Sequence, residues 1–195
     1  MLDLIQTIEI LSPKEVKDLN EYINTLEFRT NSVFDQGNGV TRQDIRNSTG
    51  CTLNEDNHLT KNLHLKMNSA LDEYQDRISK INEMFSVYPA IGGYCTKSWR
   101  EGIQILDYIE DQKYDFHHDV ADEKEKIEFH RTISIVLYLT NDFEGGKTLF
   151  THKGFKPLPG HALIFPSNWC FPHCGETVKS GKKRVAVTWY YVEKQ

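Results

Sequence analysis

The sequence contains no apolar stretch that approaches the roughly 20 residues needed to span a bilayer. Its first residues, Met1-Leu-Asp-Leu-Ile, also lack the basic region and long apolar core of a secretory signal. Only four cysteines are present, and their spacing does not form the tight framework of small secreted domains. We therefore expect no membrane partner and a reducing, cytoplasmic compartment.

An excess of positive charge is absent as well. The formal net charge is −5, whereas a nucleic acid or an anionic membrane requires a basic surface on its partner. The one short basic run, residues 179–184, is expected to be mostly a solvated turn, with Lys183 as the exception. The charge argues against a nucleic-acid partner and leaves the oligomeric state undetermined.

No internal repeat, low-complexity tract or linker divides the 195 residues, a length that suits one domain with a substantial core. Residues 1–90 are predicted to be mainly helical support. Ser12 and Pro13 are typical of an N-cap and the first helical position, opening a helix to about Leu26. Apolar spacing predicts one or two further helices over residues 59–85. The other elements expected here are a short strand over residues 7–11 and a region that is mostly loop or short strand over residues 31–55.

After Pro89 the sequence changes to short runs of β-forming residues, several of them separated by turns with Gly or Pro. Helices followed by closely spaced strands are typical of an α+β domain. We predict a jelly-roll or barrel core over residues 91–195. The expected strands are 103–109, 114–120, 132–140, 147–150, 161–165 and 184–192.

His117 and Asp119 are separated by one residue, so on an extended strand both side chains leave the same face. A second imidazole from a neighbouring strand, with His173 as the candidate, would complete a two-histidine, one-carboxylate ligand set. This set leaves coordination positions open and suits non-haem Fe(II) that binds a co-substrate and oxygen. His118 is expected on the opposite face, although a one-residue change of register would exchange it with His117. The remaining histidines are expected at the surface or in packing positions: His58, His64, His130, His152 and His161.

Further motifs follow in a defined order between residues 103 and 192. They are Ile103-Gln-Ile-Leu-Asp-Tyr108, Tyr114-x-x-His117-x-Asp119, Arg131-x-x-Ser134, Glu144-Gly-Gly-Lys-Thr148, Pro157-x-Pro159-Gly-His-Ala-Leu-Ile-Phe165, and His173 with Lys183 and Trp189 ten and sixteen residues later. Their joint order resembles the 2-oxoglutarate/Fe(II)-dependent dioxygenases, specifically the prolyl 4-hydroxylase-like group. Weaker echoes occur at residues 11–16 and 46–48.

The resemblance implies a double-stranded β-helix as the catalytic core, preceded by supporting helices. It implies Fe(II), 2-oxoglutarate and O2 as cofactors, with ascorbate as an optional addition. The implied metal ligands are His117, Asp119 and His173. The distal carboxylate of 2-oxoglutarate is implied to pair with Lys183, assisted by two further residues, Tyr108 and Thr148.

Strand parity points to the same lysine. Lys183 shares one strand face with Val185, Val187 and Trp189, a mainly apolar set that we expect inside the barrel. An ammonium group is costly there unless it meets an anion, which a dicarboxylate co-substrate supplies. Arg184 lies on the other face and is expected to be solvated.

The resemblance places Arg131 and Trp189 near the substrate, but the residues alone leave alternatives open. Trp189 is equally explained as a core residue, Tyr108 as a half-buried aromatic and Thr148 as an ordinary strand residue. Arg131 heads an apolar strand, where its planar fork would bind a substrate carbonyl or carboxylate, or else an acid of the charged loop. That loop, residues 122–128, is either an exposed connection or a lid over the site.

We predict an oxygenase that hydroxylates an unactivated C–H bond and releases succinate and CO2. The preferred substrate is a prolyl residue of a peptide or protein, hydroxylated at position 4. The run Cys174-Gly-Glu176-Thr177-Val178 departs from the family, which usually has Gly-Cys-Pro-Val there, so another protein side chain or a free amino acid stays open.

Two other classes of function remain as alternatives. One is a zinc hydrolase with the same three ligands, against which Lys183 argues; the other is a non-catalytic β-barrel binding module. A zinc site around His173 built from Cys170 and Cys174 is a weaker hypothesis, because no second pair has finger-like spacing.

Overall fold

The computed structural model describes residues 2–35, 38–86, 100–120 and 129–193. Its largest sheet has seven strands in the order β1-β12-β8-β15-β6-β5-β2. The central pairs are antiparallel, with Val187 of β15 opposite Val136 of β8 and Gln104 of β6. The bounds of these strands are β1 (Gln6–Glu9), β12 (His161–Pro166), β8 (Phe129–Tyr138), β15 (Lys183–Glu193), β6 (Gln104–Tyr108), β5 (Thr49–Thr52) and β2 (Arg29–Thr30).

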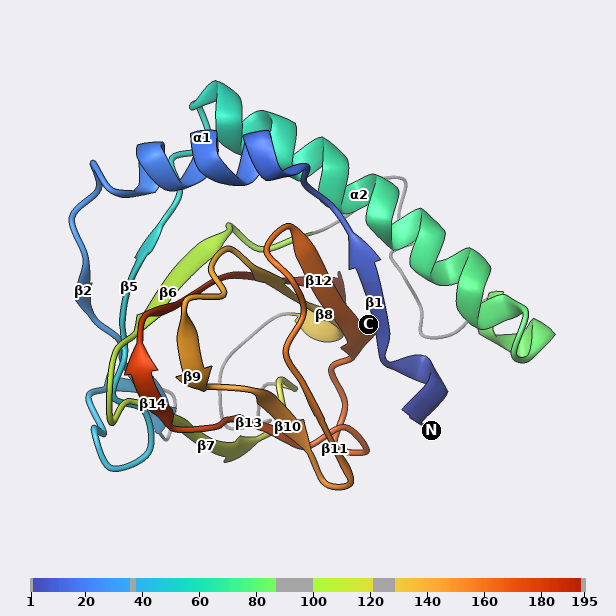
Figure 1. The fold of residues 1–195 in the computed structure, drawn as a ribbon. Coiled ribbons are helices and arrows are strands. Elements are labelled where there is room, and N and C mark those ends of the chain that lie inside the picture. Colours follow the sequence, from blue (N-terminus) through green and yellow to red (C-terminus); the bar gives the residue numbers. More distant parts are fainter. Residues whose placement is uncertain (1, 36–37, 87–99, 121–128, 194–195) are drawn as a thin grey trace.

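A smaller sheet of four strands, in the order β11-β10-β13-β7, faces the inner side of the large sheet (Figure 1). Two-stranded pairs, β14-β9 and β3-β4, extend the structure at its edges. The bounds are β11 (Lys153–Phe155), β10 (Thr148–Phe150), β13 (His173–Gly175), β7 (Tyr114–His117), β14 (Val178–Gly181), β9 (Phe143–Gly145), β3 (Val33–Asp35) and β4 (Asn38–Val40). The two facing sheets form the predicted jelly-roll core.

Two helices cover the outer side of the large sheet (Figure 1). Helix α1 (Pro13–Ile23) begins with a capping box, in which Ser12 Oγ accepts from the Glu15 backbone N–H and the Glu15 carboxylate accepts from the Ser12 N–H. The helix ends three residues before the predicted Leu26. The other helices are α2 (His58–Ser79) and the short 3-10 helices η1 (Leu2–Leu4) and η2 (Glu83–Ser86). Within the described ranges, no helix is both long and apolar enough for a membrane span.

The large sheet has an apolar layer on each side, because successive side chains of a strand point to opposite faces. The outer layer lies against the helices and includes Ile133, Ile135 and Leu137 of β8. The inner layer lies between the two sheets and includes Tyr138 of β8 and Val185 of β15. Both faces of the central strands are therefore buried.

All six predicted strands are present, with their ends shifted by a few residues. After Pro89, four strands were missed, β9, β11, β13 and β14, because three or four residues are too few to show an alternating pattern. The first 90 residues supply more than helices, since β1, β2 and β5 join the large sheet. The charged loop, residues 122–128, lies outside the described residues. Assignment of the whole chain to one domain stays a prediction.

The predicted double-glycine turn follows β9. Gly145 and Gly146 both have positive φ angles, of 68° and 62°, which side chains other than glycine rarely adopt. A Cβ atom on Gly145 would lie 2.4 Å from the backbone oxygen of Thr177. This turn therefore requires glycine, for both its backbone conformation and its close contact with the chain before β14.

Candidate active site

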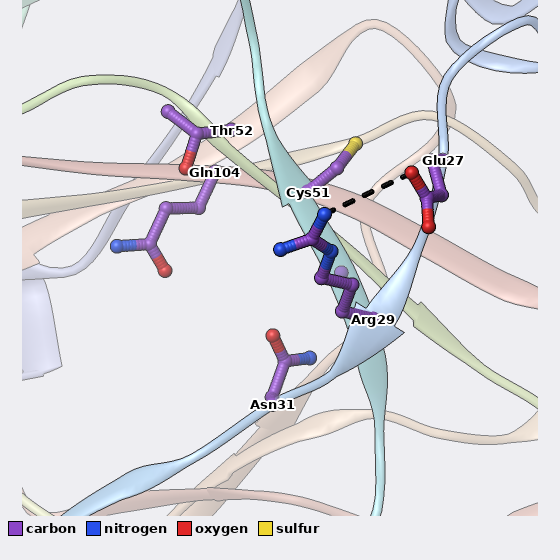
Figure 2. Close-up of a pocket in the computed structure, with 7 residues that line it drawn as sticks. Glu27, Arg29, Asn31, Cys51, Thr52 and Gln104 are labelled. Atoms are coloured by element: carbon purple, nitrogen blue, oxygen red, sulfur yellow. Dashed lines mark ion pairs between the residues drawn. The ribbon is translucent and has the colours of Figure 1, made fainter. Parts of the chain in front are cut away.

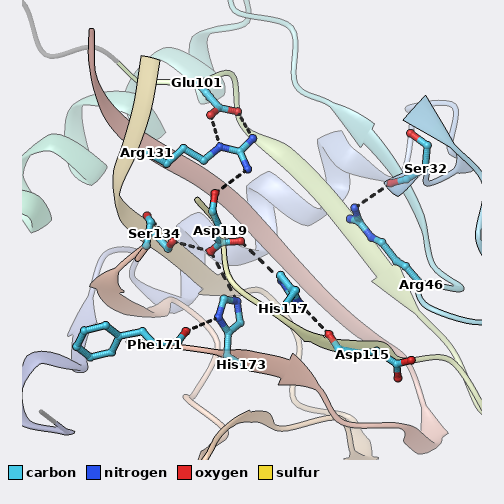
Figure 3. Close-up of polar contacts among 11 residues, drawn as sticks. Ser32, Arg46, Glu101, Asp115, His117, Asp119, Arg131, Ser134, Phe171 and His173 are labelled. Atoms are coloured by element: carbon cyan, nitrogen blue, oxygen red, sulfur yellow. Dashed lines mark hydrogen bonds and ion pairs between the residues drawn. The ribbon is translucent and has the colours of Figure 1, made fainter. Parts of the chain in front are cut away.

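The three predicted metal ligands converge between the two sheets (Figure 3). The candidate donor atoms of His117, Asp119 and His173 all lie within 4.8 Å of one another. His117 Nε2 is 3.6 Å from Asp119 Oδ1, and His173 Nε2 is 3.6 Å from Asp119 Oδ2. Donor atoms bound to one ion at about 2 Å are separated by roughly 3–4 Å, so these atoms are spaced as ligands of a single ion.

Pairing of two short strands positions the histidines, whereas a bend positions the carboxylate. His117 is the last residue of β7 and lies opposite His173, the first residue of β13. Asp119 lies beyond the end of β7, where its N–H donates to the backbone oxygen of Ser167 at 3.2 Å. The expectation that His117 and Asp119 share a strand face is therefore wrong in its geometry. His118 is exposed and is not part of the cluster.

Backbone contacts determine which nitrogen of each imidazole can bind a metal. His117 Nδ1 lies 2.8 Å from the backbone oxygen of Asp115, and His173 Nδ1 lies 3.1 Å from that of Phe171. Because a carbonyl oxygen only accepts hydrogen bonds, each Nδ1 carries a proton, and Nε2 is the nitrogen of each ring that can offer a lone pair to a metal. Burial, followed by the neighbouring His173, lowers the pKa of His117 to about 4. Its Nε2 is therefore unprotonated at neutral pH.

The Asp119 carboxylate is 8% exposed and remains ionised. Burial raises its pKa, but the two histidines and hydrogen bonds from Ser134 and Trp189 outweigh burial, and the net pKa is below the ordinary value. Ser134 Oγ donates to Asp119 Oδ2 at 2.6 Å and lies 2.8 Å from Ser167 Oγ. Ser134 belongs to a motif noted in the sequence, but its contact with the metal site was not predicted.

Aromatic rings enclose the two imidazoles. The Tyr114 ring is stacked on His117, with 3.7 Å between centroids. Phe165 contacts His173 edge-on at 4.9 Å, and Phe150 lies 5.5 Å from the same ring. These rings restrict rotation of the imidazoles and exclude water from one side of the site.

Lys183 lies on the inner face of β15, as its parity predicts, and is 4% exposed. No carboxylate of the described residues forms an ion pair with it. Its Nζ lies 5.4 Å and 5.3 Å from the ring centroids of Tyr108 and Tyr138. Burial lowers the pKa of Lys183 to about 8, while Cys174 and Glu176 partly oppose the shift. A buried ammonium without a paired anion is the environment expected of a binding site for a carboxylate.

Hydroxyl groups accompany this lysine. Thr148 Oγ1 is buried in β10 and lies 2.8 Å from the Tyr138 hydroxyl. Tyr108 is also buried, and β6 and β15 pair it directly with Lys183. A Cβ atom on Gly175 would lie 4.0 Å from Lys183 Nζ, so the backbone of β13 passes directly beside the ammonium. Tyr138 was missed as a candidate, although its parity with Ser134 on β8 could have identified it.

Arg131 contacts the metal site through its neighbours. Its guanidinium binds Glu101 through two hydrogen bonds, of 2.5 and 2.8 Å (Figure 3). The guanidinium also lies 3.9 Å from the centroid of the Trp189 ring. A third N–H donates to the backbone oxygen of Asp119 at 3.4 Å. Glu101 is thus the acid that Arg131 pairs with among the described residues, whereas the expected pairing with the charged loop lies outside them.

A β-bulge explains the direction of Arg131. Tyr190 of β15 lies opposite Ile133, but the next residue, Tyr191, lies opposite Arg131, so Thr132 has no direct partner. The extra residue turns Arg131 away from the outer face that Ile133 occupies and towards half-buried Trp189. Whether Arg131 and Trp189 also contact a substrate stays a prediction.

Arg184 is buried, and the prediction that it is solvated is wrong. It is 4% exposed and forms two hydrogen bonds with Asp107, of 2.7 and 2.8 Å. Its remaining N–H groups donate to the side-chain oxygens of Asn20 and Asn24, at 3.1 and 2.8 Å. Asn20 belongs to α1 and Asn24 caps it, so the helix encloses the face of β15 that was expected to meet water.

A polar hollow of about 380 Å³ lies at the β2 edge of the large sheet (Figure 2). Asn31 at its wall donates to Ser48 Oγ at 2.9 Å, and Arg46 Nε donates to the same oxygen at 3.2 Å. The Arg46 guanidinium lies 4.8 Å from the centroid of Tyr114, the ring that stacks on His117. Two hydrogen bonds, a cation–π contact and a ring stacking therefore connect the hollow to His117. The other residues lining it are Glu27, Arg29, Gly50, Cys51, Thr52 and Gln104.

The donor set fits Fe(II). Two neutral imidazoles and one carboxylate are the ligands of the non-haem Fe(II) triad, and neither Cys170 nor Cys174 belongs to the cluster. Residues 103–191 also match the family model described as the 2OG-Fe(II) oxygenase superfamily, where 2OG is 2-oxoglutarate. The match covers 89 of the 195 residues, and this part of the chain is similar to that superfamily. Fe(II), 2-oxoglutarate and O2 are the cofactors that the superfamily implies.

Two proteins with similar sequences are named as prolyl 4-hydroxylases. A putative prolyl 4-hydroxylase of Acanthamoeba polyphaga mimivirus is 34% identical over 135 residues, which cover 58% of this chain and 55% of the relative. Prolyl 4-hydroxylase 1 of Arabidopsis thaliana is 28% identical over 210 residues, covering 93% of this chain and 66% of the relative. The chain thus spans about half to two thirds of the length of these relatives, and is prolyl 4-hydroxylase-like.

Solved structures share the fold. A viral collagen prolyl hydroxylase from Paramecium Bursaria Chlorella virus-1 superposes with a TM-score of 0.68 at 21% identity, covering 97% of this chain and 96% of that chain. A Pseudomonas putida prolyl-4-hydroxylase superposes with a TM-score of 0.65 at 15% identity, covering 98% and 92%. The predicted double-stranded β-helix with supporting helices is confirmed.

Proposed function

We propose that this protein is an Fe(II)- and 2-oxoglutarate-dependent oxygenase that hydroxylates a prolyl residue of a peptide or protein. One observation supports this above the others: the triad of His117, Asp119 and His173 lies in the same inner layer as Lys183, a buried cation without a paired anion among the described residues. A metal site alone has many uses. A metal site together with a binding site for a carboxylate suits a keto-acid co-substrate.

Bound Fe(II), with 2-oxoglutarate and O2, supplies the oxidising chemistry: one oxygen atom enters a C–H bond as hydroxyl, and the other enters the succinate formed as CO2 leaves. The residues of the chain would hold the metal ion and orient its ligands. His117 and His173 present Nε2 lone pairs because their Nδ1 protons are engaged by backbone oxygens. Asp119 supplies the negative charge, and Ser134 fixes the direction of its carboxylate.

Lys183 is the proposed partner of the distal carboxylate of 2-oxoglutarate. The pKa of Lys183 is about 8, so the amine is mainly protonated at pH values below 8. An incoming anion favours that protonated form. Thr148 and Tyr138, which already hydrogen-bond to one another, place hydroxyl groups in the same inner layer, and Tyr108 lies directly opposite Lys183. Together these groups would orient the co-substrate and keep water away from it.

The substrate is proposed from the relatives together with the rim of the site. Prolyl hydroxylases act on proline, and one solved relative was crystallised with a peptide fragment of hypoxia inducible factor. Arg131 and Trp189 lie beside Asp119 and are the proposed substrate contacts. Two of the five Arg131 N–H groups bind Glu101 and a third binds the Asp119 backbone oxygen, so the other two and the Trp189 ring are the groups left for the substrate. A cytoplasmic location and a role for ascorbate remain proposals.

The decisive experiment separates metal, co-substrate and substrate. Adding 2-oxoglutarate to the anaerobic Fe(II) protein should produce a weak visible charge-transfer band, which His117→Ala should abolish. Succinate release should then be stimulated by a proline-bearing peptide, with a mass increase of one oxygen on the peptide. Absence of the band in the wild-type protein would favour the zinc-hydrolase or binding-module hypotheses. A band with stimulation by free amino acids only would reject the peptide substrate.

A further inference from the structure

Trp169 is the most exposed of the large apolar side chains in the described part of the chain, at 75%. Isolated exposed apolar residues are common and need no explanation by themselves. An exposed indole is less common than other exposed apolar side chains, because it has more apolar surface than most and usually buries that surface. What distinguishes Trp169 further is the rigidity and the location of the turn that carries it.

The turn of residues 167–172 connects β12 to β13 and is held by its own hydrogen bonds. The Cys170 N–H donates to Asn168 Oδ1 at 2.9 Å, and the Phe171 N–H donates to the Asn168 backbone oxygen at 3.0 Å. Phe171 is buried in the inner layer and anchors the far side of the turn. Trp169 therefore sits at the tip of a fixed turn, and its exposure is imposed by the fold.

Both ends of this turn contact the metal site. At one end, the Ser167 backbone oxygen accepts from the Asp119 N–H, and Ser167 Oγ lies 2.8 Å from Ser134 Oγ. At the other end, the Phe171 backbone oxygen holds Nδ1 of His173. Two residues of chain span at most about 7 Å, so the indole lies on the order of 10–15 Å from the three ligands.

The Ser167 N–H also donates to the backbone oxygen of Thr132, at 2.9 Å. Thr132 is the bulged residue beside Arg131, one of the two proposed substrate contacts. The turn thus borders the side of the metal site where Arg131 and Trp189 lie. An indole on this side is placed to meet a chain that approaches the metal past those residues.

We propose that Trp169 is a docking residue for the peptide substrate, and that it contacts a proline or another apolar residue a few positions from the target. This inference rests on the proposed function. Extended, proline-rich peptides rise about 3.1 Å per residue and are bound through aromatic side chains, on whose flat faces the pyrrolidine ring packs. A span of 10–15 Å corresponds to roughly three to five residues of such a chain.

Two other exposed apolar residues provide matched controls. Phe116 is exposed on β7 but is adjacent to His117, so strand alternation directs it away from the imidazole side. Leu65 is exposed on α2, beyond the outer layer of the large sheet. If exposure alone mattered, truncating these side chains would have the same effect as truncating Trp169.

The test compares a long proline-rich peptide with a short one that ends within two residues of the target. Trp169→Ala should raise KM for the long peptide about three- to tenfold, the range for one aromatic contact. The KM for the short peptide, kcat, and succinate release without peptide should stay unchanged. Trp169→Phe should retain most of the affinity, and Leu65→Ala should match the wild type.

A binding readout is independent of turnover. Titrating the long peptide into the protein should shift or quench tryptophan fluorescence. The change should be smaller in Trp169→Phe, and the short peptide, which reaches only Trp189, should give the same change in both proteins. Equal KM values for the long peptide in wild type and Trp169→Ala would overturn the proposal. So would equal losses for both peptides, because these would indicate damage to the metal site. Weaker self-association in Trp169→Ala, at unchanged KM, would assign the indole to an interface between copies of the chain.

Failure of the proposed function gives a different result. If the wild-type protein hydroxylated neither peptide and gave no charge-transfer band, the oxygenase assignment itself would be wrong. If the band formed and the short peptide were hydroxylated, the oxygenase assignment would hold. The comparison of KM values would then test the role of Trp169 alone.

Discussion

Lys183 and Arg184 are adjacent on β15, equally buried, and surrounded in opposite ways. Arg184 faces α1, where Asp107 and two asparagines receive its N–H groups. Lys183 faces the space between the sheets, where its described neighbours are aromatic rings and hydroxyl groups. A buried cation that is paired with an anion contributes to the packing of the elements around it. A buried cation without an anion lowers the stability of the fold and is available to bind a negatively charged ligand. The outer face of the sheet is structural, and the inner face is a site.

The largest effect on stability is expected at Arg184. Arg184→Met leaves the Asp107 carboxylate buried without its main partner and should lower the free energy of unfolding by about 3–5 kcal/mol. Lys182, 2.6 Å from Asp107, should keep the loss near the low end of that range. Urea denaturation measures the change. The double variant Arg184→Met/Asp107→Leu should recover much of it, and a loss below about 1 kcal/mol for the single variant would remove the distinction between the two cations.

Lys183→Met is the counterpart on the inner face. Removing an unpaired buried cation should leave the free energy of unfolding unchanged or raise it, because the desolvation penalty disappears. Succinate formation at a fixed, limiting concentration of 2-oxoglutarate should fall about 100-fold, corresponding to roughly 3 kcal/mol for a charge-assisted contact. A variant that lost stability but kept its affinity for 2-oxoglutarate would show that Lys183 is structural like Arg184.

Two buried hydroxyl groups extend the comparison to metal binding. Ser134 donates to Asp119 on the inner face, and Thr188 donates to the backbone oxygen of Glu101 on the outer face. Ser134→Ala should weaken Fe(II) binding about 10- to 100-fold, measured by competition with a chelator, because the carboxylate loses its orientation. Thr188→Val, the matched control, should lower stability by about 1 kcal/mol and leave Fe(II) affinity intact. Equal effects on Fe(II) affinity would contradict the division of roles.

The smallest effect concerns pH. Lys183 has a pKa of about 8 and binds a carboxylate only when protonated, so its contribution is complete below pH 8 and is lost above it. The KM for 2-oxoglutarate should rise towards tenfold per pH unit above about 8. In Lys183→Arg, whose guanidinium stays charged, any remaining binding should be independent of pH over that range. A flat profile for the wild-type protein would mean that Lys183 stays protonated or does not bind the co-substrate.

Sequence reasoning worked best where a local rule was sufficient. Alternation along the last strand placed Lys183 on the inner face, and the Ser12-Pro13 pair located the start of α1. The order of motifs identified His117, Asp119 and His173 as a set, although they come from β7, a bend and β13. The chemistry of these three side chains limits which metal they can bind, and the sequence is sufficient to identify that limit.

Sequence reasoning failed where segments far away in the chain determine the surroundings of a residue. Arg184 looked solvated because its partners Asn20 and Asn24 lie about 160 residues earlier, at the end of a helix whose docking face no local pattern reveals. Arg131 was placed by simple alternation, but a bulge opposite Tyr191 reverses its direction. Strand β13 has three residues and forms only because β10 and β7 flank it.

By itself, the sequence determined the chemical inventory: two imidazoles and one carboxylate, which the order of motifs identified, and one lysine that strand alternation directs inward. The tertiary structure alone decided which cation would be neutralised. Alternation states only that Lys183 and Arg184 point in opposite directions, and says nothing of what lies there. The packing of α1 on one side paired Arg184, whereas the small sheet on the other side brings no described carboxylate to Lys183. The partners of a buried charge are supplied by segments far away in the chain.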